Sequence, residues 1–207
     1  MRIGIIGDTH GNYGHYEAMA QRLYLNDEVD ITVQLGDHGI LCNQVPPLLK
    51  GVGETYPHKF FCGNHDDYKT VEGRPDFLGR YGIVVPQVFF VSGGYSPDYK
   101  NRTSGWDWVH YEELNSQEME MALSLYQETK PSIVITHEPP ESLVNDLLEK
   151  SPVKHGFERR ASRTGCLFDI MLKVHRPKVW YFGHYHFKYS NDIFHCVPID
   201  DYIICSI

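Results

Sequence analysis

Polar residues with metal-binding and proton-transfer chemistry recur in this chain directly after short apolar runs. The last of these positions, FGHYHF at 182–187, holds two histidines two residues apart. The others are Asp8 with His10, Asp37, Asn64 with His65, and His137. Carboxylate, amide and imidazole groups bind divalent ions, and imidazoles also move protons. The repeated placement predicts one shared site.

The number and type of these side chains favour two metal ions. Residues i and i+2 of an extended segment point the same way, so each closely spaced pair can serve one site. The seven donors are Asp8, His10, Asp37, Asn64, His137, His184 and His186. Seven exceed the needs of one tetrahedral ion, and the carboxylate of Asp37 could bridge two. Mixed imidazole and carboxylate ligation suits Mn, Fe, Zn, Co or Ni, and argues against calcium.

The charge of such a site favours an anionic substrate. Two divalent ions bring about +4, and two aspartates with a hydroxide bring about −3, which leaves the site near +1. Two ions roughly 3.5–4 Å apart can lower the pKa of a water and hold a phosphoryl oxygen for in-line displacement. His65 would protonate the leaving oxygen, or alternatively only contact phosphate. The net charge of −8 argues against a general binder of duplex DNA.

The elements that must position these residues alternate in type, as in a layered α/β domain. Strands are expected at 2–7, 30–35, 58–62, 83–85, 88–92, 132–136, 178–182, 186–190, 193–197 and 202–205. Helices are expected at 13–25, 43–50, 116–129, 140–150 and 162–175. Asn115 and Glu118 predict a capping box, and Pro131 a helix end. The last three strands are expected to be antiparallel. The polar residues end five strands, where sites of α/β sheets assemble.

Length and composition predict one soluble domain spanning 1–207. The chain has 207 residues, of which 42% are hydrophobic and 22% charged. No apolar stretch approaches the roughly 18–20 residues that span a bilayer, and MRIGIIGDTH is typical of a first core strand. The five cysteines form no C-x-x-C pair, which indicates reduced thiols and a cytoplasmic location.

Five motifs together resemble the calcineurin-like metallophosphoesterase superfamily. They are GDTHG (7–11), LGDHG (35–39), CGNHDD (62–67), ITHEPP (135–140) and FGHYHF (182–187). They match, in order, the superfamily pattern D-x-H, G-D, G-N-H-[DE], a late His and G-H-x-H. The resemblance covers nearly the whole chain, and it implies a four-layer αββα sandwich.

The resemblance also implies roles for individual residues. The first ion would be held by Asp8, His10, Asp37 and His186. The second ion would be held by Asp37, Asn64, His137 and His184. His65 matches the general acid and phosphate contact. We expect Mn²⁺ at both positions, with Fe, Zn, Ni or Co as alternatives.

The second motif departs from the phosphoprotein phosphatase pattern. Those relatives carry G-D-x-V-D-R-G, whereas this chain reads GDHGIL and lacks the second Asp and the Arg. The departure weakens a protein-phosphatase assignment and leaves open whether Asp66 or Asp67 orients His65. The segment SGGYSPDYKNRTSGWDW (92–108), followed by EEL, resembles a bacterial and phage branch with a G-G-x-x-S segment.

Three further residues are candidates for substrate contact. His38 could touch substrate where relatives use arginine, or serve the loop. Arg102 could reach the phosphate, with Trp106 or Trp108 stacking on a base; the alternative is a surface loop with its aromatic residues packed inward. Arg163 is the last residue of the basic stretch VKHGFERRASR (153–163). This stretch predicts either a basic rim that steers a nucleotide or RNA end toward the site, or a solvated helix start.

These inferences predict a dinuclear phosphoesterase in which hydroxide attacks phosphorus and His65 protonates the leaving group. The missing arginine favours phosphodiester, nucleotide-like or nucleic-acid substrates. The alternatives are a phosphoprotein or nucleotide monoester phosphatase, a mononuclear hydrolase, and a non-catalytic metal-binding scaffold. The sequence does not predict an oligomeric state.

Overall fold

The computed structural model describes residues 1–40, 57–154, 156 and 159–207. The expected helix at 43–50 lies outside the described residues. Within the described ranges, no helix combines the length and the apolar character that crossing a membrane requires.

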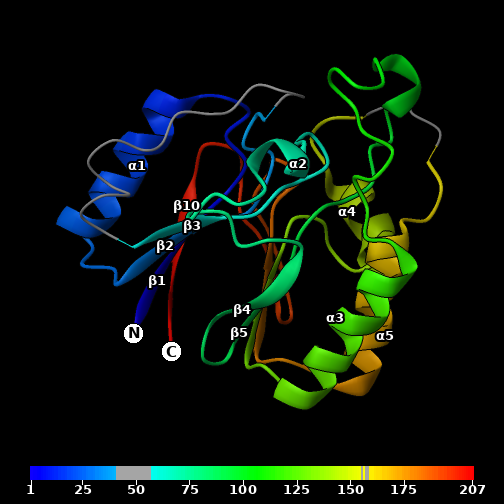
Figure 1. Ribbon diagram of the computed structural model, residues 1–207. Coiled ribbons are helices and arrows are strands. Elements are labelled where there is room, and N and C mark those ends of the chain that lie inside the picture. Colours follow the sequence, from blue (N-terminus) through cyan, green and yellow to red (C-terminus); the bar gives the residue numbers. More distant parts are fainter. Residues whose placement is uncertain (41–56, 155, 157–158) are drawn as a thin grey trace.

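Two sheets form the centre of the fold (Figure 1). The first has the order β10 (Tyr202–Ser206), β1 (Arg2–Ile6), β2 (Ile31–Gln34) and β3 (His58–Phe60). The second has the order β4 (Tyr81–Val85), β5 (Val88–Val91), β6 (Ile133–Thr136), β7 (Val179–Phe182), β9 (Phe194–Cys196) and β8 (Tyr189–Asn191). The strands β1–β3 are parallel to one another, as are β5, β6, β7 and β9, while β10, β4 and β8 pair antiparallel at the edges.

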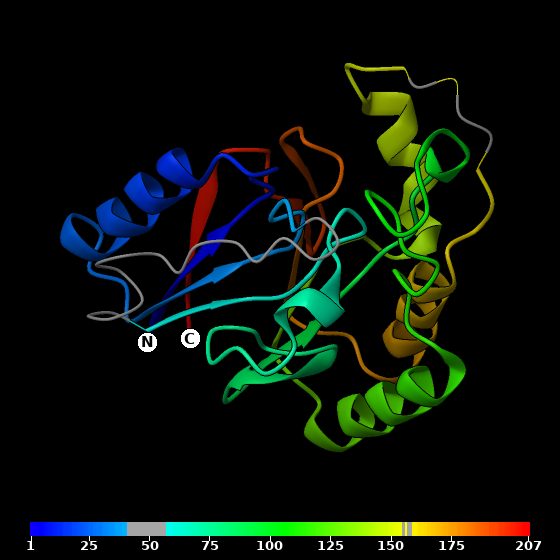
Figure 2. The ribbon, with the colours of Figure 1, turned by 45° about the horizontal axis from the view of Figure 1, so that its top comes forward.

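Helices cover the outer face of each sheet (Figure 2). The helices are α1 (Tyr13–Leu25), α2 (Tyr68–Val71), α3 (Ser116–Thr129), α4 (Val144–Lys150) and α5 (Arg163–Val174), with 3₁₀ turns η1 (Tyr99–Asn101) and η2 (Glu141–Leu143). Helix α1 packs on the first sheet, and α3 and α5 pack on the second. The predicted capping box begins α3: the Asn115 side chain accepts from the Glu118 backbone, and the Glu118 carboxylate accepts from the Asn115 backbone.

The alternation of side chains along each strand builds the four layers. Ile3 and Ile5 of β1 point between the sheets, whereas Ile6 points toward α1. On the second sheet, Phe90 faces the space between the sheets and Phe89 faces α3. Apolar residues on both faces of both sheets therefore give a helix–sheet–sheet–helix sandwich, which confirms the predicted αββα architecture.

The last strand differs from the expectation. The strands at 189–191 and 194–196 form an antiparallel hairpin, but β10 leaves this sheet and pairs with β1, where Cys205 lies opposite Ile3. Ile203 and Cys205 thereby join the core between the sheets. Short spacing along the chain predicts antiparallel pairing without showing which sheet edge the strand joins.

Candidate metal centre

The five polar segments meet at one edge of the sandwich, because β1, β2, β3, β6 and β7 all end there. The first sheet contributes Asp8, His10, Asp37 and Asn64, and the second contributes His137, His184 and His186. Both chain termini lie at the opposite end (Figure 1). The structure thus brings all seven predicted ligands together.

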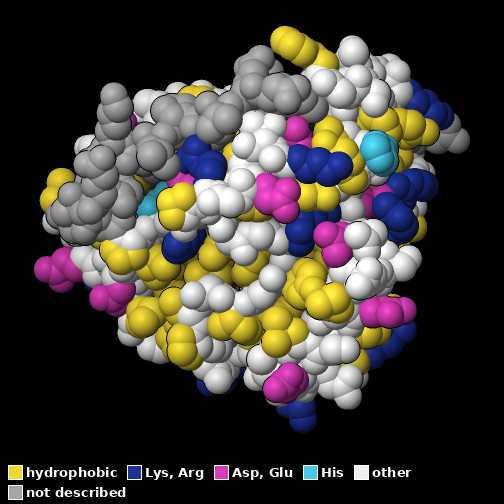
Figure 3. Space-filling view, in the orientation of Figure 1, with side chains coloured by type: hydrophobic (Ala, Val, Ile, Leu, Met, Phe, Trp, Pro, Cys, Tyr) yellow, Lys and Arg dark blue, Asp and Glu magenta, His cyan; other side chains and the backbone are white. Residues whose placement is uncertain are grey.

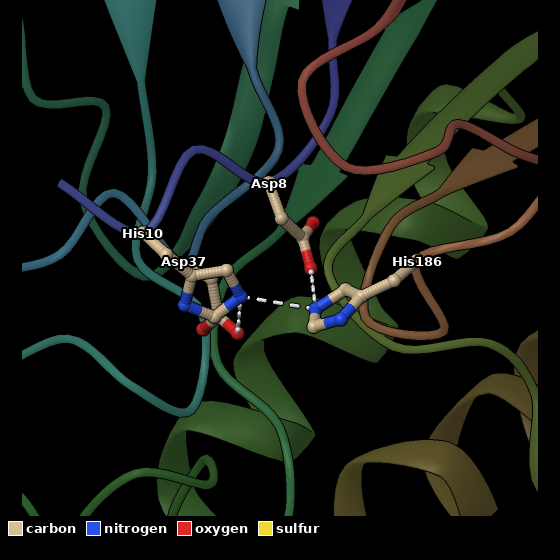
Figure 4. A group of neighbouring side chains, drawn as sticks. All are labelled: Asp8, His10, Asp37 and His186. Carbon is tan, nitrogen blue, oxygen red and sulfur yellow. Dashed lines mark hydrogen bonds and ion pairs between the residues drawn. The ribbon is translucent and has the colours of Figure 1, made fainter. Parts of the chain in front are cut away.

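The first group joins residues 8, 10, 37 and 186 (Figure 4). The Nε2 atom of His186 lies 2.9 Å from Asp8 Oδ2 and 3.0 Å from His10 Nε2. His10 Nε2 is 3.6 Å from Asp37 Oδ2. One donor atom from each of the four residues lies within 4.8 Å of the others. Ring nitrogens and carboxylate oxygens therefore converge on a space the size of one ion.

The second group joins Asp37 with Asn64, His137 and His184. Asn64 Oδ1 lies 2.8 Å from His137 Nε2 and 2.9 Å from His184 Nδ1. His137 Nε2 is also 3.3 Å from Asp37 Oδ1. Asp37 therefore turns one oxygen toward each group, which is the geometry that a bridging carboxylate needs.

One buried carboxylate oxygen of the site has no hydrogen-bond partner, which bears on whether these residues fit metal ions. Asp37 Oδ2 is buried and accepts no hydrogen bond, although buried polar atoms nearly always have partners. Burial alone would raise the pKa of Asp37, but the imidazoles of His137, His65, His10 and His184 outweigh it and lower that pKa. Burial, reinforced by His137, lowers the pKa of His184. Against their burial, the neighbouring aspartates raise the pKa of His137 and of His186. The fit to metal ions therefore rests on the unpartnered Asp37 oxygen and on the donor set of ionised carboxylate and ring nitrogens.

The backbone at this edge is shaped for convergence. His10, Asp37, His184 and His186 have positive φ values of 41°, 52°, 69° and 61°. A left-handed conformation costs about 1–2 kcal/mol for a residue with a side chain, and such strain gathers at functional sites. Two glycines, which have no side chain, leave room for the carboxylates of Asp8 and Asp37. A Cβ atom at Gly183 would lie 2.2 Å from Asp8 Oδ1, and one at Gly63 would lie 2.2 Å from Asp37 Oδ1.

Hydrogen bonds around the ligands fix their orientation. His137 Nδ1 donates to the Leu35 carbonyl at 3.0 Å, which leaves its Nε2 lone pair for the centre. The amide of Asn64 donates to Ser96 Oγ at 2.9 Å, and that hydroxyl donates to Glu112 Oε2 at 2.6 Å. Neither Ser96 nor Glu112 was predicted to take part, although Ser96 lies in the 92–108 segment and Glu112 begins the EEL that follows it.

His65 lies above the shared carboxylate. Its backbone N–H donates to Asp37 Oδ1 at 2.9 Å, and its Nε2 atom lies 3.9 Å from Asp37 Oδ2. The guanidinium of Arg102 contacts both ring nitrogens of His65, at 2.7 Å from Nε2. Arg102 is itself held by Asp98 at 2.8 Å and by the carbonyl of Asp107 at 3.0 Å. Burial, with Arg102 adding to it, lowers the pKa of His65.

Neither neighbouring aspartate orients the His65 ring. The buried carboxylate of Asp66 accepts backbone N–H groups from residues 38, 39, 40 and 63. Asp67 caps α2 by accepting from the backbone of Lys69. Asp66 therefore serves the backbone and Asp67 the start of α2, whereas the guanidinium of Arg102 and the edge-on ring of His10, with centroids 5.2 Å apart, contact the His65 ring.

The position of His38 does not match the predicted substrate contact. Its ring is only 2% exposed and stacks on Phe60 with centroids 5.0 Å apart, with Tyr16 edge-on at 4.9 Å. Burial lowers its pKa to about 3, so the imidazole stays neutral. An apolar aromatic pocket beneath the second motif draws this side chain into the core.

The substrate contact of Arg163 stays a prediction, and its guanidinium lies next to an acid. Arg163 and Arg160 both pair with Glu113, and Arg159 pairs with Glu141 at 2.8 Å. Basic and acidic side chains likewise lie next to one another on the face shown in Figure 3. Three of the four basic side chains of the stretch therefore pair with acids where the structure describes it, and α5 begins at Arg163, which favours the solvated helix start over a steering rim.

Comparison with known families agrees with the fold and the site. The family model for calcineurin-like phosphoesterases matches residues 1–204 of the 207. No curated protein matches the chain. The chain belongs to the calcineurin-like phosphoesterase family, whose members are metal-dependent hydrolases of phosphoric esters. Together with the Asp and His cluster, membership indicates a metal-dependent phosphoesterase.

Proposed function

We propose that the protein is a dinuclear phosphoesterase that cleaves phosphodiesters or nucleotide-like esters. The observation that carries the proposal is Asp37, whose two oxygens face two separate groups of ligands and whose Oδ2 atom has no hydrogen-bond partner. Mn²⁺ is the proposed ion at both positions, with Fe, Zn, Ni or Co as alternatives. Two bound divalent ions would supply a hydroxide nucleophile at neutral pH and would stabilise charge on the phosphoryl oxygens.

Arg102 supplies the positive charge that the second motif lacks. In the phosphatase pattern an arginine follows the bridging aspartate, whereas here a guanidinium reaches the same edge from the 92–108 segment. It is anchored by Asp98 and contacts His65. We therefore assign Arg102 to binding of a phosphate oxygen, because a guanidinium offers donors in fixed geometry to such a group.

His65 is the proposed general acid, and a leaving-group series tests this role. Loss of a general acid slows esters with poor leaving groups more than esters of p-nitrophenol, which leaves readily without a proton. We expect His65→Ala to reduce turnover more steeply as the pKa of the leaving alcohol rises. An equal reduction across the series would instead assign His65 to phosphate contact alone.

The first experiment is metal content together with turnover. We expect close to two ions per chain after loading with Mn²⁺, and faster hydrolysis of bis-p-nitrophenyl phosphate than of p-nitrophenyl phosphate. The reverse preference would assign a monoester phosphatase. One ion per chain would indicate a mononuclear hydrolase. Absence of turnover with all five metals would favour a scaffold, and partner binding that survives Asp37→Asn would support it.

A further inference from the structure

A cleft of about 280 Å³ opens directly from the metal centre. Asp37, Asn64, His184 and His186 lie at one end of it, together with His65. The side walls are mostly apolar and are formed by Tyr95, Pro97, Pro139, Val144, Leu148 and Tyr185. A group bound at the metal end would therefore extend between apolar walls.

The walls are held in place by the core. Tyr95 is 5% exposed, and its backbone N–H donates to the buried carboxyl of Glu138 at 3.2 Å. Val144 is 3% exposed and begins α4, and Tyr185 packs against the core of the second sheet. The cleft is thus preformed, as binding sites for small molecules generally are.

The polar groups of the cleft suit the edge of a flat ring. The guanidinium of Arg159 lines the cleft while its Nη2 atom is held by Glu141 at 2.8 Å. The carboxyl of Glu138 lines it too and accepts from Ser162. Apolar and tyrosine walls with a few polar groups favour a planar heterocycle over a sugar or a peptide, since aromatic surfaces stack and ring edges carry donors and acceptors.

We propose that this cleft is a base-binding subsite, so that the substrate is a nucleotide-derived phosphoester. The base would lie between the Tyr95–Pro97 wall and the Val144–Leu148 wall while its phosphate lies at Asp37. This inference rests on the proposed function, because it places the phosphate at the metal centre. It assigns the base to this cleft rather than to Trp106, whose side chain is 55% exposed and does not line the cleft.

Binding of two non-hydrolysable ligands to the metal-loaded protein tests the subsite. The probes are the phosphonate analogues of 5′-AMP and of ribose 5-phosphate, compared by titration calorimetry. Because stacking of a base typically strengthens binding by about tenfold or more, we expect the AMP analogue to bind at least about tenfold more tightly. Equal affinities, or binding of neither ligand, would overturn the proposal.

Variants at Leu148 test whether the tighter binding of the AMP analogue arises in this cleft. Leu148 is 38% exposed, so it tolerates replacement, and tryptophan there would fill the cleft. We expect Leu148→Trp to abolish the preference for the AMP analogue, and Leu148→Ala to weaken it. Leu25→Trp, on α1 at 68% exposure, is the matched control and should retain it. A preference that survives Leu148→Trp in folded protein would overturn the assignment.

The two proposals fail separately. A protein that prefers the AMP analogue but hydrolyses no ester with any of the five metals would retain the subsite and lose the phosphoesterase function. A protein that hydrolyses esters but binds both analogues equally would retain the function and lose the subsite.

Discussion

Replacing Ser96 by alanine should lower the metal affinity of the second position and leave the metal affinity of the first position unchanged. The Ser96 hydroxyl receives a hydrogen bond from the Asn64 amide and gives one to Glu112. Its loss leaves the amide free to rotate, so that Asn64 Oδ1 no longer faces His137 and His184. No residue of the first group contacts Ser96 among the hydrogen bonds of the described chain, so the first position should be unaffected.

The magnitude follows from the two lost hydrogen bonds. Leaving a buried polar group without its partner costs about 1–3 kcal/mol, so the free energy of unfolding should fall by that amount. Removing a partner that orients a ligand typically lowers metal affinity by about 10–100-fold. For the second ion, this range corresponds to about 1.4–2.7 kcal/mol of binding free energy.

Calorimetric titration with Mn²⁺ separates the two binding steps. We expect Ser96→Ala to retain one step at wild-type affinity and to weaken the other by about 10–100-fold. Ser92→Ala is the control, because Ser92 is equally buried but donates to the carbonyl of Cys62 and contacts no ligand side chain. Two unchanged steps in Ser96→Ala, or the same selective weakening in Ser92→Ala, would refute the reasoning.

Four further predictions follow from the site. Gly183→Ala places a Cβ atom against Asp8, so it should lose the first ion and about 1–3 kcal/mol of stability; full metal content would contradict this. Arg102→Ala should raise KM for a diester about tenfold or more, because a hydrogen bond from a charged group contributes about 1.5–3 kcal/mol; an unchanged KM would remove Arg102 from phosphate binding. Burial raises the pKa of Glu112 from 4.5 to about 7, so the native state favours its protonated form, and the stability this gives is complete below pH about 4.5 and is lost as pH rises toward 7. Between pH about 4.5 and 7, the Tm of Glu112→Gln should fall less than the Tm of the wild type. An equal fall in Tm for both proteins would contradict the assignment. Mn²⁺ at about 100 times its Kd adds about 2.7 kcal/mol per site, so chelation should lower Tm by several degrees; an unchanged Tm would argue against binding by the folded protein.

The site was predictable from sequence because its residues follow strands that the apolar pattern reveals. Residues 8, 37, 64 and 137 each stand one to four positions beyond a strand, so strand ends alone place them at one edge. The four layers required the family resemblance, because alternation within a strand shows that both faces are buried but not what buries them.

Other features depend on contacts between distant segments. Arg102 reaches His65 across 37 positions, through a loop whose path is set by the ion pair with Asp98 and by the carbonyl of Asp107. His38 stands beside the predicted ligand Asp37 in sequence, yet its side chain packs into a pocket that contains Phe60 and Tyr16. Local sequence gives no sign of either outcome.

The division of the seven predicted ligands between two sheets has a kinetic consequence. Side chains that follow β1, β2 and β3 meet those that follow β6 and β7 only after the sheets have docked. We therefore expect the complete set of donors to exist only late in folding. Ions bound there would tie the two halves together at the edge opposite the termini. Interactions that form after the transition state slow unfolding and leave the folding rate nearly unchanged. In the cell, such ions would act mainly by lengthening the lifetime of the folded protein.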